Sequence, residues 1–253
     1  MFLGFDIGNT NTVMGIYRDD SRVPFKRFRF VTRKNVSADS LSGEIDGYLG
    51  TFRGEISSAA LSSVAPELND LYLKVLHELI GVKTHIISCN SNLGIEISYP
   101  DPSQLGVDRI VNAEAALVEY GGDNLIVDIG TAATFCVVLK NGLFDGGIIA
   151  PGIGTTIKAL ADGASNLPEV AFEAPERLVA RDTVNAIKSG FYYGWISLTE
   201  GLIHRIQQSY DRNLTVLLTG GFSETMGHAL GDLHIVDSDL TMKGIRIIGG
   251  NNS

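Results

Sequence analysis

The chain has 253 residues, of which 44% are apolar and 19% charged, a composition typical of globular proteins and not of disordered or fibrous ones. Lysines and arginines number 20 against 29 aspartates and glutamates, giving a formal net charge of −9. This acidic balance argues against nucleic acid as a partner, because a phosphate backbone is bound by a basic surface. The sequence has neither a signal-peptide pattern nor an apolar run of membrane-spanning length, so we expect a cytoplasmic protein without membrane association.

The residues that most often bind zinc show no metal-binding spacing. Cys89 and Cys136 lie far apart in the sequence, and none of the five histidines forms an i, i+4 pair with a glutamate between. We therefore expect both cysteines to be small buried apolar residues, and no zinc site.

The first half of the sequence alternates between strand and helix patterns. Strands are predicted at residues 1–6, 12–17, 25–31 and 57–62, with shorter ones at 84–88 and 95–97. Helices are predicted at residues 37–49, 68–80 and 107–120, the last after a proline-bearing loop. This alternation predicts an α/β fold.

The pattern starts again after residue 121. A strand over residues 125–128 ends in Asp128 before an Ile-Gly-Thr turn, just as the first strand ends in Asp6 before an Ile-Gly-Asn turn. Further strands are predicted at residues 134–139, 143–149 and 214–218, with a long helix over 183–210 and a closing segment over 235–248. The repeat predicts two copies of one α/β unit, with domains at residues 1–121 and 122–253.

The acid before each glycine turn suggests a nucleotide phosphate site. Gly8 lets a phosphate approach the backbone because it has no Cβ, and residues 9–12 offer short hydrogen-bond donors. Asp6 and Asp128 could hold a hydrated Mg²⁺ that neutralises charge during phosphoryl transfer. A plain hairpin turn explains one such copy equally well, but two copies with the acid in register favour phosphate binding.

Other nucleotide motifs are missing from the sequence. It contains neither a Walker A motif nor a G-x-G-x-x-G between a strand and a helix, which argues against P-loop and Rossmann chemistry. Residues 152–154 form only an isolated G-x-G. We interpret Thr219-Gly220-Gly221 as an ordinary strand-to-helix turn, although its glycines could also admit a nucleoside.

A third candidate lies at the start of the helix predicted over residues 107–120. Asp108 falls in its first turn, where the helix dipole favours a carboxylate. It is either an ordinary helix-start acid beside a solvated Arg109, or the acceptor of a proton from a substrate hydroxyl. Arg109 follows about 100° around the helix. From there it could hold a substrate carboxylate through a bidentate pair of hydrogen bonds.

Four motifs together resemble the type III pantothenate kinase family in order and spacing: DIGNTNT at 6–12, GVDR at 106–109, DIGTA at 128–132 and RDTVNA at 181–186. This family belongs to the acetate and sugar kinase/Hsp70/actin superfamily. The resemblance therefore implies duplicated ribonuclease-H-like (actin-like ATPase) domains with a cleft between them. It also implies ATP-dependent phosphorylation of the 4′-hydroxyl of pantothenate to 4′-phosphopantothenate, the first step of coenzyme A biosynthesis.

The resemblance implies roles for individual residues. The phosphates of ATP would contact Asp6, Ile7, Gly8, Asn9, Thr10, Asn11, Thr12 and Val13, and Thr131 would also contact ATP. Pantothenate would contact Tyr99, Gly106, Val107, Asp108, Arg109 and, across a homodimer interface, Thr183. Asp108 would accept the hydroxyl proton. Asp128 would hold a monovalent cation, K⁺ or NH₄⁺, and Asp6 would bind Mg²⁺ through water.

Two other functions are compatible with such a fold, because a fold does not fix a function. One is a kinase for another small hydroxy acid or a sugar. The other is a regulator that binds nucleotide or pantothenate without turnover. The pair Asp108 and Arg109 suits a substrate that has both a hydroxyl and a carboxylate, and a protein that only binds has no need of a base.

Overall fold

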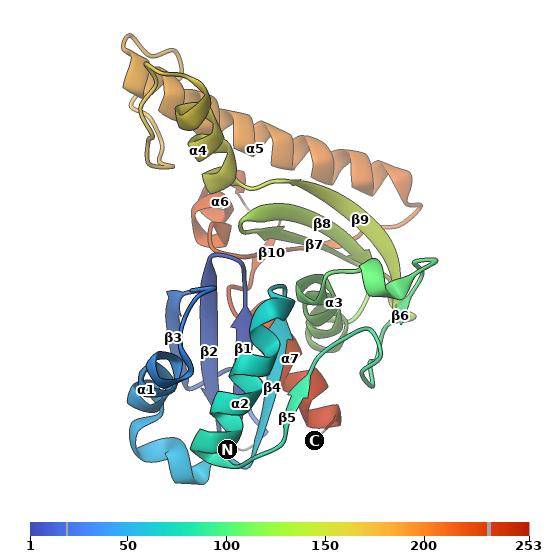
Figure 1. Cartoon of the computed structure of the whole chain (residues 1–253). Helices are drawn as coiled ribbons and strands as arrows, with labels where there is room; N and C mark the ends of the chain where they lie inside the picture. The colour runs from blue at the N-terminus through green and yellow to red at the C-terminus, as the bar shows by residue number, and fades with distance from the viewer. Residues whose placement is uncertain (19, 232–233, 253) are drawn as a thin grey trace. The chain divides into compact units, whose positions relative to one another are not determined.

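The computed structural model describes residues 1–18, 20–231 and 234–252, and the chain divides into two compact units (Figure 1). The first unit consists of Met1–Tyr120, Asn141–Phe144 and Asp239–Ser253, and the second of Gly121–Lys140 and Asp145–Ser238. The chain changes unit at the point where the sequence pattern starts again. Its last segment returns to the first unit, whereas a division at residue 121 places that segment in the second domain.

The first unit is built on a five-stranded sheet in the order β3-β2-β1-β4-β5. Its strands are β1 (Phe2–Ile7), β2 (Asn11–Tyr17), β3 (Lys26–Val31), β4 (Ser58–Ser63) and β5 (Thr84–Ile86). β2 runs antiparallel to both β1 and β3, whereas β4 runs parallel to both β1 and β5. The short β6 (Glu96–Ile97) pairs with Leu143 and Phe144, which begin β9 and still belong to this unit.

Helices cover both faces of the first sheet (Figure 1). They are α1 (Ala38–Leu49), α2 (Asn69–Ile80), α3 (Val107–Tyr120) and α7 (Leu240–Asn251), with short 3-10 turns at Gly50–Glu55, Pro66–Leu68 and Pro102–Gln104. Leu3, Phe5 and Ile7 alternate along β1 and are buried in a core with residues of α1 and α2. The intervening residues of β1 therefore face the opposite side, where α7 packs.

α7 approaches the sheet and α3 closely because glycines stand at the points of contact. A Cβ at Gly4 of β1 would lie 3.0 Å from Ile245, and one at Gly244 only 1.9 Å from the carbonyl oxygen of Val111 in α3. The Tyr17 hydroxyl also donates a hydrogen bond to the Met242 carbonyl at 2.7 Å. These contacts explain why the last residues of the chain belong to the first unit.

The second unit repeats the strand arrangement of the first. Its strands are β7 (Asn124–Ile129), β8 (Ala132–Val138), β9 (Leu143–Pro151), β10 (Thr215–Thr219) and β11 (Ile235–Val236), in the order β9-β8-β7-β10-β11. β7 runs antiparallel to β8, and β10 runs parallel to both β7 and β11. β7 to β11 thus correspond in order to β1 to β5. The duplicated α/β fold predicted from the sequence is confirmed.

The helices of the second unit are α4 (Ile153–Gly163), α5 (Thr183–Ser209) and α6 (Ser223–Leu230). The sequence pattern predicted α5 but neither α4 nor α6, which are short and rich in glycine, serine and threonine. Cys136 is buried in β8 as expected, while Cys89 is only partly buried. No helix in the described part of the chain is long and apolar enough to cross a membrane.

Gly244→Ala is expected to lower the free energy of unfolding by about 3 kcal/mol. The new methyl group would lie 1.9 Å from a backbone carbonyl oxygen, which cannot rotate away as a side chain can. Gly47→Ala is the matched control, because Gly47 lies inside α1 with nothing within 4 Å of the added Cβ. It should raise stability by up to about 1 kcal/mol. Equilibrium urea unfolding measures both, and a Gly244→Ala protein as stable as the wild type would contradict this packing.

Candidate active site

The first predicted phosphate turn is the hairpin between β1 and β2. The Gly8 amide donates to the Asn11 carbonyl at 3.0 Å, and a Cβ at Gly8 would lie 2.8 Å from that same oxygen. Asn9 and Thr10 at the tip are exposed, whereas Ile7 is buried in the core. The polar groups of this turn that an incoming phosphate can reach are therefore those at its tip.

The hydroxyl of Thr12 supports this turn from inside the protein. It is buried and lies 2.9 Å from the Thr32 hydroxyl and 3.4 Å from the Tyr72 hydroxyl. The Thr32 amide donates to the Thr10 carbonyl at 2.9 Å. Thr32, just after β3, and Tyr72 of α2 thus hold the turn in place through buried polar contacts. Val13, which follows Thr12, is half-buried opposite Asp6.

The second predicted turn lies between β7 and β8 and is one residue shorter. Ile129 pairs with Ala133, whereas Ile7 pairs with Thr12. The Gly130 amide donates to the Ala132 carbonyl at 3.0 Å. Thr131 is exposed, so the residue predicted to contact ATP is accessible.

Two further glycines lie against the second turn. A Cβ at Gly152, before α4, would lie 2.1 Å from the Gly130 carbonyl oxygen. A Cβ at Gly220, after β10, would lie 2.4 Å from an oxygen of the Asp128 carboxylate, and the φ of Gly220 is +90°. The Gly-Gly step after a buried strand was the only sequence signal for this contact. Backbone atoms therefore pack closely around the turn that follows Asp128. A side chain at Gly152 or Gly220 would force these atoms apart.

Each of the two turn acids has a buried hydroxyl as its neighbour on the adjacent parallel strand. Ser62 of β4 lies opposite Asp6, and Thr219 of β10 lies opposite Asp128. Both hydroxyls are buried, and neither has a hydrogen-bond partner within the described part of the chain. Buried polar groups are normally satisfied, so each is an available partner for a water or an ion held by the acid.

Asp108 is the second residue of α3 and folds back over the start of its helix. Its Oδ1 accepts a hydrogen bond from the Arg109 amide at 2.9 Å, and a Cβ at Gly106 would lie 2.5 Å from that oxygen. Burial raises the pKa of Asp108, although the amide and the charge of Arg109 act in the opposite direction. The sequence predicted that the helix dipole would favour the ionised carboxylate of Asp108. In the structure the effect of burial on the pKa is larger, and a carboxylate with a raised pKa is a stronger base.

Arg109 is not solvated, so the alternative that treated it as a surface residue is wrong. Its side chain is 5% exposed, and its guanidinium carbon lies 5.8 Å from the ring centre of Tyr99 and 5.4 Å from that of Phe144. The two rings meet edge to face at 5.9 Å. A guanidinium packed against two aromatic rings is fixed in direction, which suits recognition of a planar carboxylate.

Thr183 is the first residue of α5 and is exposed. Asp182 caps this helix, accepting a hydrogen bond from the Asn185 amide at 2.9 Å. The first unit contains the β1–β2 turn, Tyr99 and the Gly106–Arg109 motif, and the second contains Asp128, Thr131 and Thr183.

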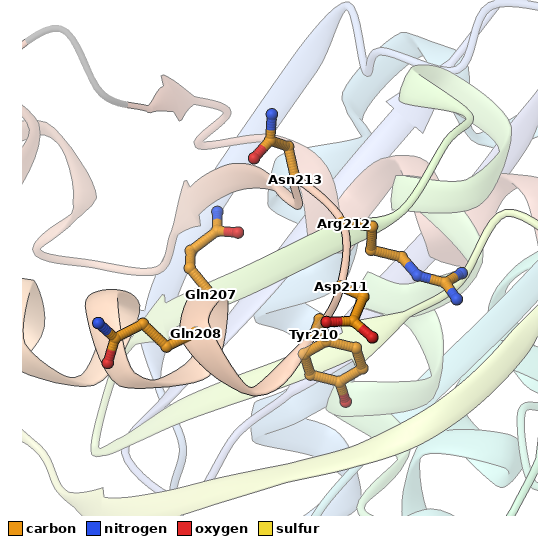
Figure 2. Close-up of a pocket in the computed structure, with 6 residues that line it drawn as sticks. All are labelled: Gln207, Gln208, Tyr210, Asp211, Arg212 and Asn213. Carbon is orange, nitrogen blue, oxygen red and sulfur yellow. The ribbon is translucent and has the colours of Figure 1, made fainter.

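A surface pocket of about 590 Å³ lies at the C-terminal end of α5 (Figure 2). It is lined by Gln207, Gln208, Tyr210, Asp211, Arg212 and Asn213, none of which is a predicted site residue. The Tyr210 hydroxyl donates to Asp145 at 2.6 Å, and burial, with help from Asp145, raises the pKa of Tyr210 to about 12. Arg212 pairs with Asp123 at 3.5 Å. These partners come from the second unit itself, so we assign no ligand to this pocket.

Comparison with known proteins identifies the family. The family model for type III pantothenate kinase matches residues 2–205. The chain belongs to the type III pantothenate kinase family. A type III pantothenate kinase from Brevibacillus brevis is 36% identical over 255 residues, covering 100% of this chain and 99% of the relative. One from Desulfosudis oleivorans is also 36% identical, over 99% of both chains. These matches confirm the family that the four motifs indicated.

The solved structures confirm the fold. A protein from Sinorhizobium meliloti described as a 2-dehydro-3-deoxygalactonokinase superposes with a TM-score of 0.61, covering 99% of this chain and 98% of that one. At 13% identity this similarity shows a shared fold alone. It agrees with the duplicated ribonuclease-H-like architecture expected of the superfamily.

The raised pKa of Asp108 makes a prediction about stability. The folded state favours the protonated carboxyl, so ionising Asp108 costs stability. This cost is absent below the ordinary aspartate pKa of about 4 and grows as the pH rises through the raised pKa. Asp108→Asn should therefore resist denaturant better than the wild type near neutral pH, and the difference should vanish toward about pH 3.

Urea unfolding at a series of pH values measures this difference. Asp39→Asn is the matched control, because Asp39 is also the second residue of a helix but is exposed. It should show no gain that grows with pH. If Asp108→Asn were less stable than the wild type at every pH, the burial of the Asp108 carboxylate would not be costly as described.

Proposed function

We propose that Asp108 accepts the hydroxyl proton of pantothenate as this kinase transfers the γ-phosphoryl group of ATP to that oxygen. The reaction follows from the family: the chain is an ATP-dependent pantothenate kinase of coenzyme A biosynthesis, and ATP acts with a divalent metal. Membership favours pantothenate over another hydroxy acid or a sugar. The assignment of the base rests on one observation, the burial that raises the pKa of Asp108.

In the proposed step, the substrate hydroxyl oxygen forms a bond to the γ-phosphorus while its proton moves to the Asp108 carboxylate. The bond from the γ-phosphorus to the bridging oxygen breaks, and ADP leaves with that electron pair. Phosphoryl transfer has a loose transition state, so positioning of the two substrates supplies much of the rate. Arg109 would bind the pantothenate carboxylate, and Tyr99, Gly106 and Val107 would line the same site.

On the ATP side, the tip of the β1–β2 turn would bind phosphate oxygens. Thr131 would also contact ATP. Asp6 would hold Mg²⁺ through water, and the metal would supply positive charge to the phosphate oxygens. The buried hydroxyl of Ser62 beside Asp6 supports this role, because a bound water could satisfy it. A hydrated Mg²⁺ needs only one or two carboxylates from the protein. A larger set of protein ligands is not required, and no group of three His, Cys, Asp or Glu side chains that could hold a metal ion occurs among the described residues.

Asp128 would hold the monovalent cation, with the Thr219 hydroxyl as its buried neighbour. After exchange into a tetramethylammonium buffer, we expect activity to be lost and to return with K⁺ or NH₄⁺, because the larger organic cation cannot enter the space bounded by Gly220. Asp128→Asn should weaken this rescue. The measurement is ADP release against cation concentration, and activity that is independent of the added cation would contradict the assignment.

We also propose that the active protein is a homodimer in which Thr183 contacts pantothenate bound to the neighbouring subunit. The exposure of Thr183 at the start of α5 supports this, because its hydroxyl is accessible to another chain.

Asp108→Asn is expected to lower kcat by about 10³-fold. Binding of ATP and of pantothenate should persist in calorimetry, because the asparagine oxygen can still accept the Arg109 amide. Asp39→Asn again serves as the control and should keep wild-type kcat. The assay couples pantothenate-dependent ADP release to NADH oxidation. If Asp108→Asn bound both substrates and kept most of its turnover, another group would be the base.

The same variant tests the shared site. Asp108→Asn chains and Thr183→Arg chains should each be inactive alone. After mixing and subunit exchange, heterodimers would contain one site with neither substitution, so partial activity should return. No recovery, with heterodimers present by native mass spectrometry, would contradict a site built from two subunits.

A further inference from the structure

Glu114, in the middle of α3, is a buried carboxylate that the proposed chemistry does not use. Its side chain is 1% exposed. Both carboxylate oxygens lie 2.9 Å from the Gly94 amide, which donates to them. Burial raises the pKa of Glu114, while the amides of Gly94 and Ile95 act in the opposite direction. A buried carboxylate is costly, and here backbone donors rather than a basic side chain stabilise it.

The loop residue that donates to this carboxylate has to be a glycine. A Cβ at Gly94 would lie 2.8 Å from Glu114 Oε1. The carbonyl oxygen of Gly94 lies in turn 2.9 Å from the position of a Cβ at Gly142, whose φ is +87°. Two glycines therefore let the loop backbone reach the carboxylate.

The residues that follow Gly94 lead directly to the pantothenate site. The Glu96 amide donates to the Gly142 carbonyl at 2.9 Å. The amide and hydroxyl of Ser98 donate to the Phe144 carbonyl at 3.2 Å and 2.8 Å. Tyr99 comes next, with its ring against Phe144 and near the Arg109 guanidinium. The segment between Gly94 and Gly106 is thus held at its start by the Glu114 carboxylate. It ends at the start of α3, the helix on which Glu114 lies.

We propose that Glu114 is a positioning residue for pantothenate, because it anchors the Tyr99 segment to the helix that carries Asp108 and Arg109. Asp108 and Glu114 are six residues apart on one helix, a rise of about 9 Å. One rigid element therefore sets the position of both the proposed proton acceptor and the loop that carries Tyr99. This inference rests on the proposed function, since it assigns Tyr99 and Arg109 to pantothenate.

A structural role and a positioning role for Glu114 lead to different expected results when the carboxylate is removed. If the carboxylate only stabilised the fold, its loss would lower the melting temperature without separating the two substrates. If it positions the Tyr99 segment, its loss weakens pantothenate binding selectively. ATP, expected at the β1–β2 turn, should then bind as before.

The test compares Glu114→Gln with Glu119→Gln. Glutamine keeps the size of the side chain but removes the charge and replaces one of the two oxygens that accept the Gly94 amide with an NH₂ donor. We expect the KM for pantothenate to rise about tenfold, the loss of roughly one charge-assisted hydrogen bond, with kcat within about twofold and the KM for ATP unchanged. Glu119 lies on the same helix but in a surface ion pair with Arg22, so its substitution should leave every constant unchanged.

A second variant approaches the contact from the loop. Gly94→Ala places a methyl group 2.8 Å from Glu114 Oε1 and should raise the same KM. Calorimetric titration with pantothenate should show weaker binding in both variants. An unchanged pantothenate affinity in folded Glu114→Gln and Gly94→Ala proteins, or an equal loss for both substrates, would overturn the inference. If the wild type itself released no ADP with pantothenate, the proposed function would fail instead.

Discussion

The backbone contact between α7 and α3 fixes the helix that carries Asp108, Arg109 and Glu114. Gly244 lies so close to the Val111 carbonyl that no larger residue fits, and the Thr241 hydroxyl donates to Asn112 at 2.8 Å beside it. α7 also packs on β1 through Gly4. The last helix, α7, therefore holds α3 against the sheet whose central strand β1 contains Asp6. An error in this packing would move the first turn of α3 relative to the turn predicted to bind ATP.

α3 carries two buried ionisable side chains, Arg109 and Glu114, and the partly buried Asp108, and each is stabilised in a different way. Asp108 accepts a backbone amide at the helix start, Arg109 lies against two aromatic rings, and Glu114 accepts amides from the loop. Desolvation opposes the charged form of both carboxylates and raises their pKa values. For Asp108 this has a chemical consequence, because a carboxylate with a raised pKa takes a proton more readily. For Glu114, the exclusion of water strengthens the hydrogen bonds from the loop amides at the start of the segment that leads to Tyr99.

The features that the sequence predicted best are those set by residues close together in the chain. The two Asp-Ile-Gly turns, the alternating strands and the amphipathic α3 follow from short-range periodicity, and the structure has them within a residue or two of the predicted ranges. Contacts between distant segments were not predictable. Nothing in the sequence placed the final helix beside β1 or buried Arg109 against the rings of Tyr99 and Phe144. For the contact of Gly220 with Asp128, the Gly-Gly step after a strand was the only signal. These features arise from tertiary packing, which hydrophobic periodicity does not encode.

The two turns share one pattern, and their differences suit the two ligands proposed for them. The first is one residue longer, and Asn9 and Thr10 project into solvent, where a phosphate can reach them. In the second, the Thr131 carbonyl already accepts hydrogen bonds from the Gly152 amide and the Thr155 hydroxyl. Gly220 closes the space beside Asp128. A small cation can enter such an enclosed carboxylate and also satisfy the Thr219 hydroxyl, whereas a polyphosphate is far larger. The proposed roles differ in the same way: the first turn would bind phosphate oxygens at its tip, whereas the second would hold an ion at Asp128 and contact ATP only through Thr131.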